Sequence, residues 1–169
     1  FAVQYGHAAA LEILVKAGAD LNWQENDGWT ALMMAASSGN PDMIRMLLAA
    51  NANPVQFNTK GYGAHSIAFF NEHFEQSRII AEAALERAIL TSDLNAILLM
   101  VADGAPVNLQ TEKGVTALMA ATNTGQVEVV GRLLAVEGIN VDLTETDGWT
   151  ALMFACAGDH ALIVRQLLD

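Results

Sequence analysis

Apolar residues recur along this chain with the three- and four-residue spacing of amphipathic helices. In residues 41–50, for example, the apolar positions include Met43, Ile44, Leu47 and Leu48. No segment alternates apolar and polar residues in twos over the length of a β-strand. We therefore predict an all-α protein of short paired helices, with almost no regular sheet beyond hairpin tips.

A motif of a polar turn followed by a short helix occurs three times along the chain. The stretch "NDGWTALMMAASSGN" from Asn26 returns as "EKGVTALMAATNTGQ" from Glu112 and as "TDGWTALMFACAGDH" from Thr146. The period is visible in the turn glycines, since Gly61 follows Gly28 by 33 residues. Each unit contains a turn, a helix rich in small residues, a second turn and an amphipathic helix. Two such helices cannot bury their apolar faces alone, so the units must stack on one another.

This period and element order resemble the ankyrin repeat, and the resemblance covers essentially the whole chain. The family's T-P-L-H-x-A-A motif corresponds to Thr30–Ala36, Thr116–Ala121 and Thr150–Ala155, with Ala in place of Pro and Met in place of His. The resemblance implies an ankyrin-repeat solenoid without the hydrogen bonds that the His normally makes. Soft methionine side chains are expected to fill that space. Met33, Met34, Met119 and Met153 lie at the helical spacing of core residues, and a methionine-rich ligand groove is the less favoured alternative.

We predict one ankyrin-repeat domain over residues 1–169. Its six units are residues 1–24 (partial), 25–57, 58–83 (motif lost), 84–110 (hairpin missing), 111–144 and 145–169 (partial). Gly114 follows Gly61 by 53 residues, whereas two full repeats need about 66, so we expect a notch in the row of hairpins. Ala84 to Leu90 is predicted to be the first helix of the fourth unit, and about 94–102 the second. Neither end carries a polar cap, so we expect a segment of a longer array.

The resemblance implies that hairpin tips and first helices form a concave face that contacts another protein. The residues directly after the hairpin glycines are Trp29, Tyr62, Val115 and Trp149. Large aromatic side chains on exposed tips commonly anchor interfaces. A polar rim is predicted from Asn26, Asp27, Glu112, Lys113, Thr146 and Asp147. The alternative is that Trp29 and Trp149 fold back over neighbouring hairpins and serve packing.

Net charge narrows the class of partner. The formal charge is -11 at pH 7, which opposes binding to nucleic acid and favours a basic or charge-tolerant peptide. We therefore predict a protein-interaction module for a protein or peptide ligand. Two other classes stay open: a substrate-presenting segment of a larger enzyme, and a structural spacer or self-association unit.

Residues capable of catalysis or metal binding do not converge in the sequence. Cys156 and His160 are four apart, but a glycine-containing turn separates them, and Cys156 corresponds to the small core residue Ala36. His65 and His73 lie eight apart without a nearby cysteine, so no zinc site is expected. We predict no catalytic residue, no cofactor and no metal.

The single cysteine, Cys156, rules out an internal disulfide and fits a reducing compartment. No signal peptide or membrane-spanning run is recognised, so we expect no membrane insertion. The expected location is intracellular and cytoplasmic, with a nuclear location open.

Asn22 is a candidate modification site. In animal cells, ankyrin repeats resembling this one are substrates of an asparaginyl hydroxylase that prefers a leucine and then an acidic residue, an apolar residue and asparagine. "LVKAGADLN" fits this preference with Leu14, Asp20, Leu21 and Asn22. The alternative is an unmodified turn asparagine that stabilises the hairpin.

Overall fold

The computed structural model describes residues 2–169, which form ten α-helices. They are α1 (Ala8–Lys16), α2 (Ala31–Ser38), α3 (Pro41–Ala49), α4 (Ala64–Phe70), α5 (Phe74–Thr91), α6 (Leu94–Ala102), α7 (Ala117–Asn123), α8 (Val127–Leu134), α9 (Ala151–Ala157) and α10 (Ala161–Leu168). The only β-pairing within residues 2–169 consists of two isolated antiparallel bridges, Phe57 with Gly63 and Gln110 with Thr116. The all-α prediction is confirmed.

Side-chain caps fix where the repeated helices begin. Thr30, Thr116 and Thr150 precede α2, α7 and α9, and each hydroxyl accepts a hydrogen bond from the backbone N–H three residues on, at 3.2–3.3 Å. Helix α3, the second helix of the repeat that contains α2, starts at Pro41. The Asn40 side chain accepts a hydrogen bond from the Met43 N–H in the first turn of this helix. These short polar residues therefore set the helix boundaries.

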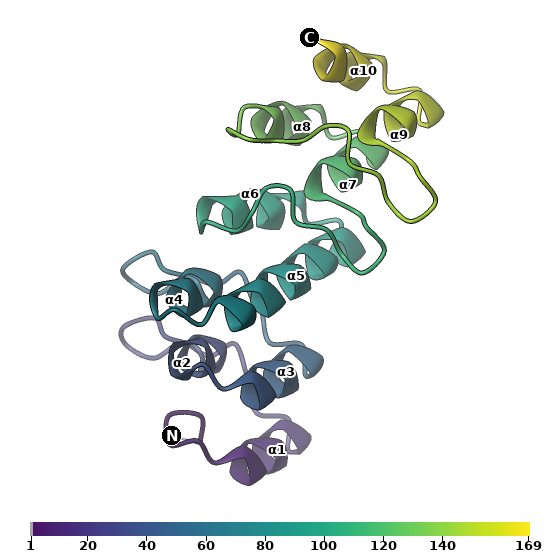
Figure 1. Ribbon diagram of the computed structural model, residues 1–169. Helices are drawn as coiled ribbons and strands as arrows, with labels where there is room; N and C mark the ends of the chain where they lie inside the picture. Colours follow the sequence, from purple (N-terminus) through teal and green to yellow (C-terminus); the bar gives the residue numbers. More distant parts are fainter. Residues whose placement is uncertain (1) are drawn as a thin grey trace. The chain divides into compact units, whose positions relative to one another are not determined.

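The chain forms two compact units. The N-terminal unit contains the residues up to 84 together with 103–105, and the C-terminal unit contains 85–102 and 106–169. In the N-terminal unit α2 packs against α3 and α4, while α1 packs against α3 (Figure 1). In the C-terminal unit α7 packs against α8 and α9, α8 packs against α6 and α10, and α9 packs against α10. Each unit thus stacks its own helices into layers.

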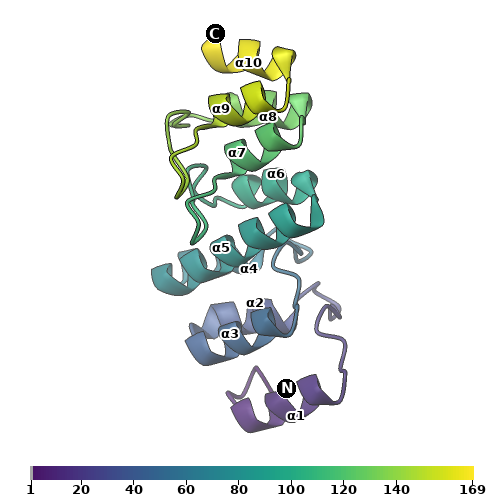
Figure 2. The same cartoon turned by 90° about the vertical axis from the view of Figure 1, so that its right-hand side faces the viewer.

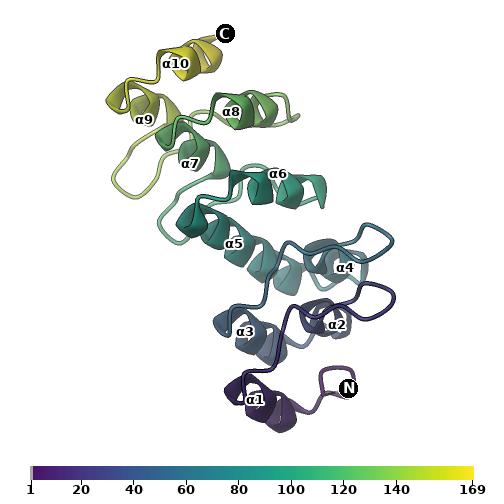
Figure 3. The same cartoon turned by 180° about the vertical axis from the view of Figure 1, so that it is seen from behind.

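Helix α5 continues without a break past the point where the fourth repeat was expected to begin. It runs from Phe74 to Thr91 without interruption, so residues 84–90 are its C-terminal half rather than a separate short helix (Figure 3). The chain turns at Ser92, which has a positive φ of 54°, and α6 follows over the predicted range. No hairpin precedes residues 84–90, and the boundary between the two compact units falls within α5. The sequence-based limits of the six repeats and the notch stay predictions.

Each unit has its own apolar core. The fully buried side chains include Leu32, Met33 and Leu47 in the N-terminal unit, and Leu118 and Met119 in the C-terminal unit. Alanines of the repeated motif lie between the helices, and those at positions 35, 36, 121 and 155 have no exposed surface. Small residues at these positions allow the stacked helices to approach closely. The predicted burial of Met33 and Met119 is confirmed, whereas Met34 is only half-buried.

The predicted burial of Met153 and Cys156 is wrong. Met153 is 51% exposed and the Cys156 thiol lies at the surface. Ala36, the counterpart of Cys156, is buried because α4 packs against α2. Helix α9 packs against α7 and α10, and its side with Met153 and Cys156 faces solvent. A core position in a stacked repeat therefore depends on which neighbour covers it.

Candidate functional site

The four hairpins of the described chain share one backbone geometry. In each, the backbone N–H at position 25, 58, 111 or 145 donates to the carbonyl of the residue four positions on, at 3.0–3.1 Å. The backbone N–H of the hairpin glycine donates to the carbonyl of the first of these residues at 2.8–2.9 Å. The residues held in this way are Trp29, Tyr62, Val115 and Trp149, so the predicted contact residues occupy equivalent places.

A glutamine side chain ties together the two hairpins of each unit. The Gln24 Nε2 atom donates to the carbonyl of Gly28 in its own hairpin at 2.7 Å and to that of Phe57 in the next at 2.8 Å. Gln110 makes the equivalent two bonds in the C-terminal unit at 2.7 and 3.0 Å. In that unit the hairpins around residues 110–116 and 144–150 project from the same side of the helices (Figure 2). Such bonds hold the tips in place before any partner arrives, which lowers the cost of binding.

The four predicted contact residues differ in exposure. Tyr62 is 44% and Trp149 is 40% exposed, as an interface anchor requires. Trp29 is half-buried and packs against the core of the N-terminal unit, which favours the packing alternative at this position. Val115 is also half-buried. Trp23, which the sequence reasoning missed, is 66% exposed and lines a surface pocket with Trp29.

The six predicted rim residues are all exposed. They are Asn26 and Asp27 in the N-terminal unit, and Glu112, Lys113, Thr146 and Asp147 in the C-terminal unit. The backbone links neighbouring tips, because the Asp27 carbonyl accepts from the Thr59 N–H and the Lys113 carbonyl accepts from the Thr146 N–H, both at 3.0 Å.

An exposed aromatic cluster lies beside Tyr62 in the N-terminal unit. Its ring meets that of Phe70 edge-on at a centroid distance of 5.6 Å, Phe69 lies 6.2 Å from Phe70, and Phe74 lies 5.4 Å from Phe69. The three phenylalanines are 52–67% exposed. The sequence reasoning missed them because they lie in the unit that lost the motif, although three phenylalanines within six residues were a visible signal. Exposed patches of this kind commonly mark interaction sites.

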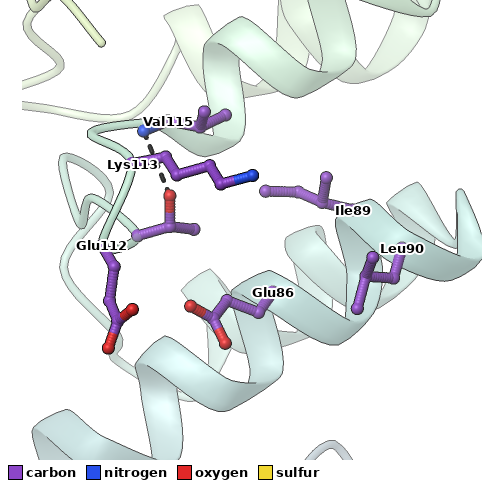
Figure 4. Close-up of a pocket in the computed structure, with 7 residues that line it drawn as sticks. Glu86, Ile89, Leu90, Glu112, Lys113 and Val115 are labelled. Carbon is purple, nitrogen blue, oxygen red and sulfur yellow. Dashed lines mark hydrogen bonds between the residues drawn. The ribbon is translucent and has the colours of Figure 1, made fainter. Parts of the chain in front are cut away.

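Two adjoining pockets lie on the surface of the C-terminal unit. One has a volume of about 240 Å³ and is lined by Glu86, Ile89, Leu90, Thr111, Glu112, Lys113 and Val115 (Figure 4). The other has a volume of about 430 Å³ and is lined by Ile89, Ser92, Val115, Met119, Ala120, Asn123, Thr124 and Phe154. They share Ile89 and Val115, so the predicted contact residue Val115 stands between them.

The carboxylate of Glu145 stabilises the hairpin that presents Trp149. It accepts hydrogen bonds from the Trp149 backbone N–H at 3.1 Å and from the Thr146 hydroxyl at 3.2 Å. Backbone hydrogen bonds from Asp147 and Trp149 hold the pKa of Glu145 below its ordinary value. The ring of Trp149 in turn lies 5.2 Å from that of Phe154. An ionised Glu145 therefore helps to position the aromatic contact residue.

Three of the four histidines contact other residues within the fold. The His65 Nδ1 atom lies 2.9 Å from the Ser77 hydroxyl in a buried pair. The rings of His73 and His160 pack against the backbone of a glycine in the preceding repeat. A Cβ on Gly39 would lie 2.6 Å from the His73 ring, and a Cβ on Gly125 would lie 2.8 Å from the His160 ring. No group of three or more His, Cys, Asp or Glu side chains in residues 2–169 is arranged to hold a metal ion.

Asn22 links two neighbouring repeats. Its side-chain oxygen accepts a hydrogen bond from the Asn53 N–H at 2.7 Å, and Asn108 makes the equivalent bond to the Asn140 N–H at 2.8 Å. Asn22 itself is exposed. A stabilising turn asparagine is therefore present, and its hydroxylation stays a prediction.

Comparisons with known proteins agree with this architecture. The family model described as ankyrin repeats (3 copies) matches residues 1–86 and 82–169. The chain is 31% identical over 155 residues to the nuclear factor NF-kappa-B p105 subunit of Mus musculus, covering 90% of this chain and 14% of that protein. It is 32% identical over 166 residues to the potassium channel AKT2/3 of Arabidopsis thaliana, covering 98% of this chain and 18% of that protein.

Among solved structures, a chain in the complex of the Bd0816 predatory endopeptidase from Bdellovibrio bacteriovorus with the immunity protein Bd3460 is similar to this one. It matches 99% of this chain and 94% of its own length, with 25% identity and a TM-score of 0.48. The chain spans less than a fifth of the curated relatives named above. None of the helices in residues 2–169 has the length and apolar character needed to cross a membrane.

Proposed function

Because the chain belongs to the ankyrin repeat family, we propose that it binds a protein or peptide ligand through its hairpin tips and first helices. Ankyrin repeats are generally protein–protein interaction modules. The observation that carries the proposal is the exposure of Tyr62 and Trp149 at hairpin positions fixed by the same backbone bonds. Large aromatic side chains on a rigid support lose little entropy on binding and often dominate affinity.

Charge supports a basic or charge-tolerant partner. The formal charge of -11 and the exposed Asp27, Glu112 and Asp147 on the hairpin tips would attract positive segments and repel nucleic acid. The proposal assigns no catalytic step to this chain, and its location is proposed to be intracellular because one cysteine fits a reducing compartment.

Two other functions compete with this proposal. Since the chain spans less than a fifth of the named relatives, it could present a substrate to a catalytic domain elsewhere in a longer protein. It could also act as a spacer or associate with itself. The full-length sequence decides the first alternative, and sedimentation velocity over a range of concentrations decides the second.

Capture of partners by the immobilised chain tests the proposal. Tyr62→Ala and Trp149→Ala should each reduce capture strongly, since truncating an aromatic anchor commonly costs about 2 kcal/mol or more. Asp27→Ala should change mainly the salt dependence. Unchanged circular dichroism confirms folding of each variant. Normal capture by both aromatic variants, with loss of capture by Arg45→Ala or Glu128→Ala on the second helices, would reject the hairpin face.

A further inference from the structure

We propose that the 240 Å³ pocket of the C-terminal unit receives a basic side chain of the partner protein, arginine or lysine. This inference rests on the proposed function and specifies the chemistry of the ligand at one point of the hairpin face. The pocket lies between the C-terminal half of α5 and the hairpin of residues 110–116. Both elements belong to the same compact unit.

Two carboxylates face each other across the mouth of the pocket. Glu86 projects from α5 and Glu112 from the hairpin, and their carboxylates point toward the same opening (Figure 4). Within residues 2–169, neither carboxylate takes part in an ion pair or a hydrogen bond. The one basic residue of the lining, Lys113, directs its ammonium group toward Ile89 rather than between the carboxylates. The two acids are therefore free to accept hydrogen bonds from an incoming cation.

The remaining wall suits the aliphatic part of a long basic side chain. The wall is lined by Ile89, Leu90 and Val115. Leu90 is 85% exposed, so this apolar surface is accessible to a ligand. Lysine and arginine place their methylene groups on apolar surface while the charged end remains near polar groups. The carboxylates and the aliphatic wall occupy different sides of the pocket, which matches the two ends of such a side chain.

Size and ligand number favour a single side chain over a larger ligand or a calcium ion. A volume of about 240 Å³ is below the range of roughly 300–1,000 Å³ typical for drug-sized ligands, but it exceeds the space of one ion or one water molecule. A calcium ion would need about six to eight oxygen ligands, whereas the lining offers two carboxylates and the Thr111 hydroxyl, which already bonds the Val115 N–H at 3.2 Å.

The neighbouring pocket indicates how the rest of the ligand continues. It shares Ile89 and Val115 with the first pocket and adds Met119 and Phe154. An apolar side chain next to the basic one in space would contact this surface. The ligand motif is therefore a basic residue accompanied by an apolar residue.

Nuclear magnetic resonance titration of the ¹⁵N-labelled chain tests the basic pocket without knowledge of the partner. The probes are Nα-acetyl-arginine amide and Nα-acetyl-citrulline amide, which have nearly the same shape but differ in charge. The arginine probe should shift the amide signals of Glu86, Glu112 and Val115, and the citrulline probe should not. Glu86→Gln and Glu112→Gln should each weaken binding of the arginine probe about 2- to 5-fold. Lys113→Met should strengthen it, because a competing positive charge is removed.

Glu137→Gln is the matched control, because Glu137 is an exposed acid of the same unit outside the pocket lining, and it should leave probe affinity unchanged. Equal shifts from both probes, no shift at the pocket, or the same loss of affinity in the control would overturn the proposal. A calcium titration that shifts the same signals at lower concentration than arginine would also overturn it. If Trp149→Ala abolishes partner capture while the arginine probe leaves the pocket signals unchanged, the proposed function stands and this assignment fails.

Discussion

At the residue scale, glycines with the same backbone conformation have different surroundings. Gly28, Gly61 and Gly114 all have φ between 76° and 81°, which an L-residue adopts at a cost. A Cβ on Gly28 would lie 2.8 Å from the Thr59 nitrogen, and one on Gly114 would lie 2.9 Å from the Glu145 Cα. A Cβ on Gly61 meets no atom of its own unit within 4 Å.

Gly28→Ala and Gly61→Ala therefore form a matched pair. Both variants should lose about 1–2 kcal/mol because of the left-handed backbone conformation. Gly28→Ala should lose roughly 1–3 kcal/mol more, because the new methyl group collides with backbone of the next hairpin. Urea unfolding monitored by circular dichroism measures both free energies. Equal losses would show that the hairpins separate easily.

Glu145 makes the Trp149 hairpin sensitive to acid. Its folded-state pKa is lowered by the backbone N–H groups of Asp147 and Trp149, so the stabilisation is present above the ordinary glutamate pKa and is lost as the pH falls through the lowered value. In a Trp23→Phe, Trp29→Phe background, the Trp149 fluorescence should change with a midpoint below pH 4.5. Adding Glu145→Gln should remove that transition. A midpoint at or above pH 4.5 would contradict the role of Glu145.

At the element scale, α4 shows how a helix that lost its threonine is capped from afar. Gly63 stands where Thr30 stands in α2, and it cannot provide a side-chain cap. The Asp103 carboxylate accepts hydrogen bonds from the Gly63 N–H at 2.9 Å and the Ser66 N–H at 3.1 Å. It thereby supplies from 40 residues away the bonds that an N-cap normally supplies locally.

Asp103→Ala should destabilise the N-terminal unit by about 1–2 kcal/mol, because the N–H groups of Gly63, just before α4, and of Ser66, in its first turn, lose their acceptor. Gly63→Thr alone should also destabilise it, because a Cβ there would lie 2.5 Å from the Asp103 Oδ2 atom. The double variant should recover stability, because its threonine can cap the helix as Thr30 does and the clash is gone. Thermal unfolding of the four proteins gives the coupling energy. Simple additivity of the two losses would refute the long-range cap.

The contrast between local and distant determinants explains what the sequence could predict. The hairpins, Thr30 and Pro41 were predictable because turns and caps depend on residues within a few positions. The cap from Asp103 and the exposure of Cys156 depend on neighbours far along the chain, or on the lack of one. The six rim residues are exposed because they lie in turns, and their role in binding stays a prediction. The cluster of Phe69, Phe70 and Phe74 and the pocket at Glu86 depend on how distant elements pack.

At the scale of the whole molecule, stability is expected to vary along the stack. Stacked repeats gain stability from contacts with their nearest neighbours, so a repeat without its hairpin forms fewer stabilising contacts. Leu90 is 85% and Leu99 is 46% exposed in the segment that follows the middle of α5. By contrast, Leu47 of α3 and Leu133 of α8 are fully buried.

Amide hydrogen exchange should therefore be faster in residues 58–110, the third and fourth repeats, than in the repeats on either side. The helices α2, α3, α7 and α8 should exchange more slowly, because their opening exposes more apolar surface. Mass spectrometry of peptides after pulse labelling would locate the protected segments. Finding residues 69–102 to be the best protected part of the chain would contradict this prediction.

Asn22 gives a prediction for protein made in animal cells. Hydroxylation of its β-carbon adds one oxygen and leaves the side-chain oxygen that accepts the bond from Asn53 in place. Tandem mass spectrometry of the peptide containing Asn22 should show the added oxygen, with the Asn108 peptide as an internal comparison. Absence of the added oxygen from the Asn22 peptide would leave the unmodified turn asparagine as the correct interpretation.

The glutamine bridge allows the same bond to be compared at two places in one polypeptide. Gln110 follows Gln24 by 86 residues, and their bonded partners in the next hairpin, Thr144 and Phe57, are 87 residues apart. A substitution at Gln24 and the same substitution at Gln110 therefore remove equivalent bonds from two different surroundings. The two variants report how much the surroundings, rather than the bond itself, contribute to the stability of a hairpin pair.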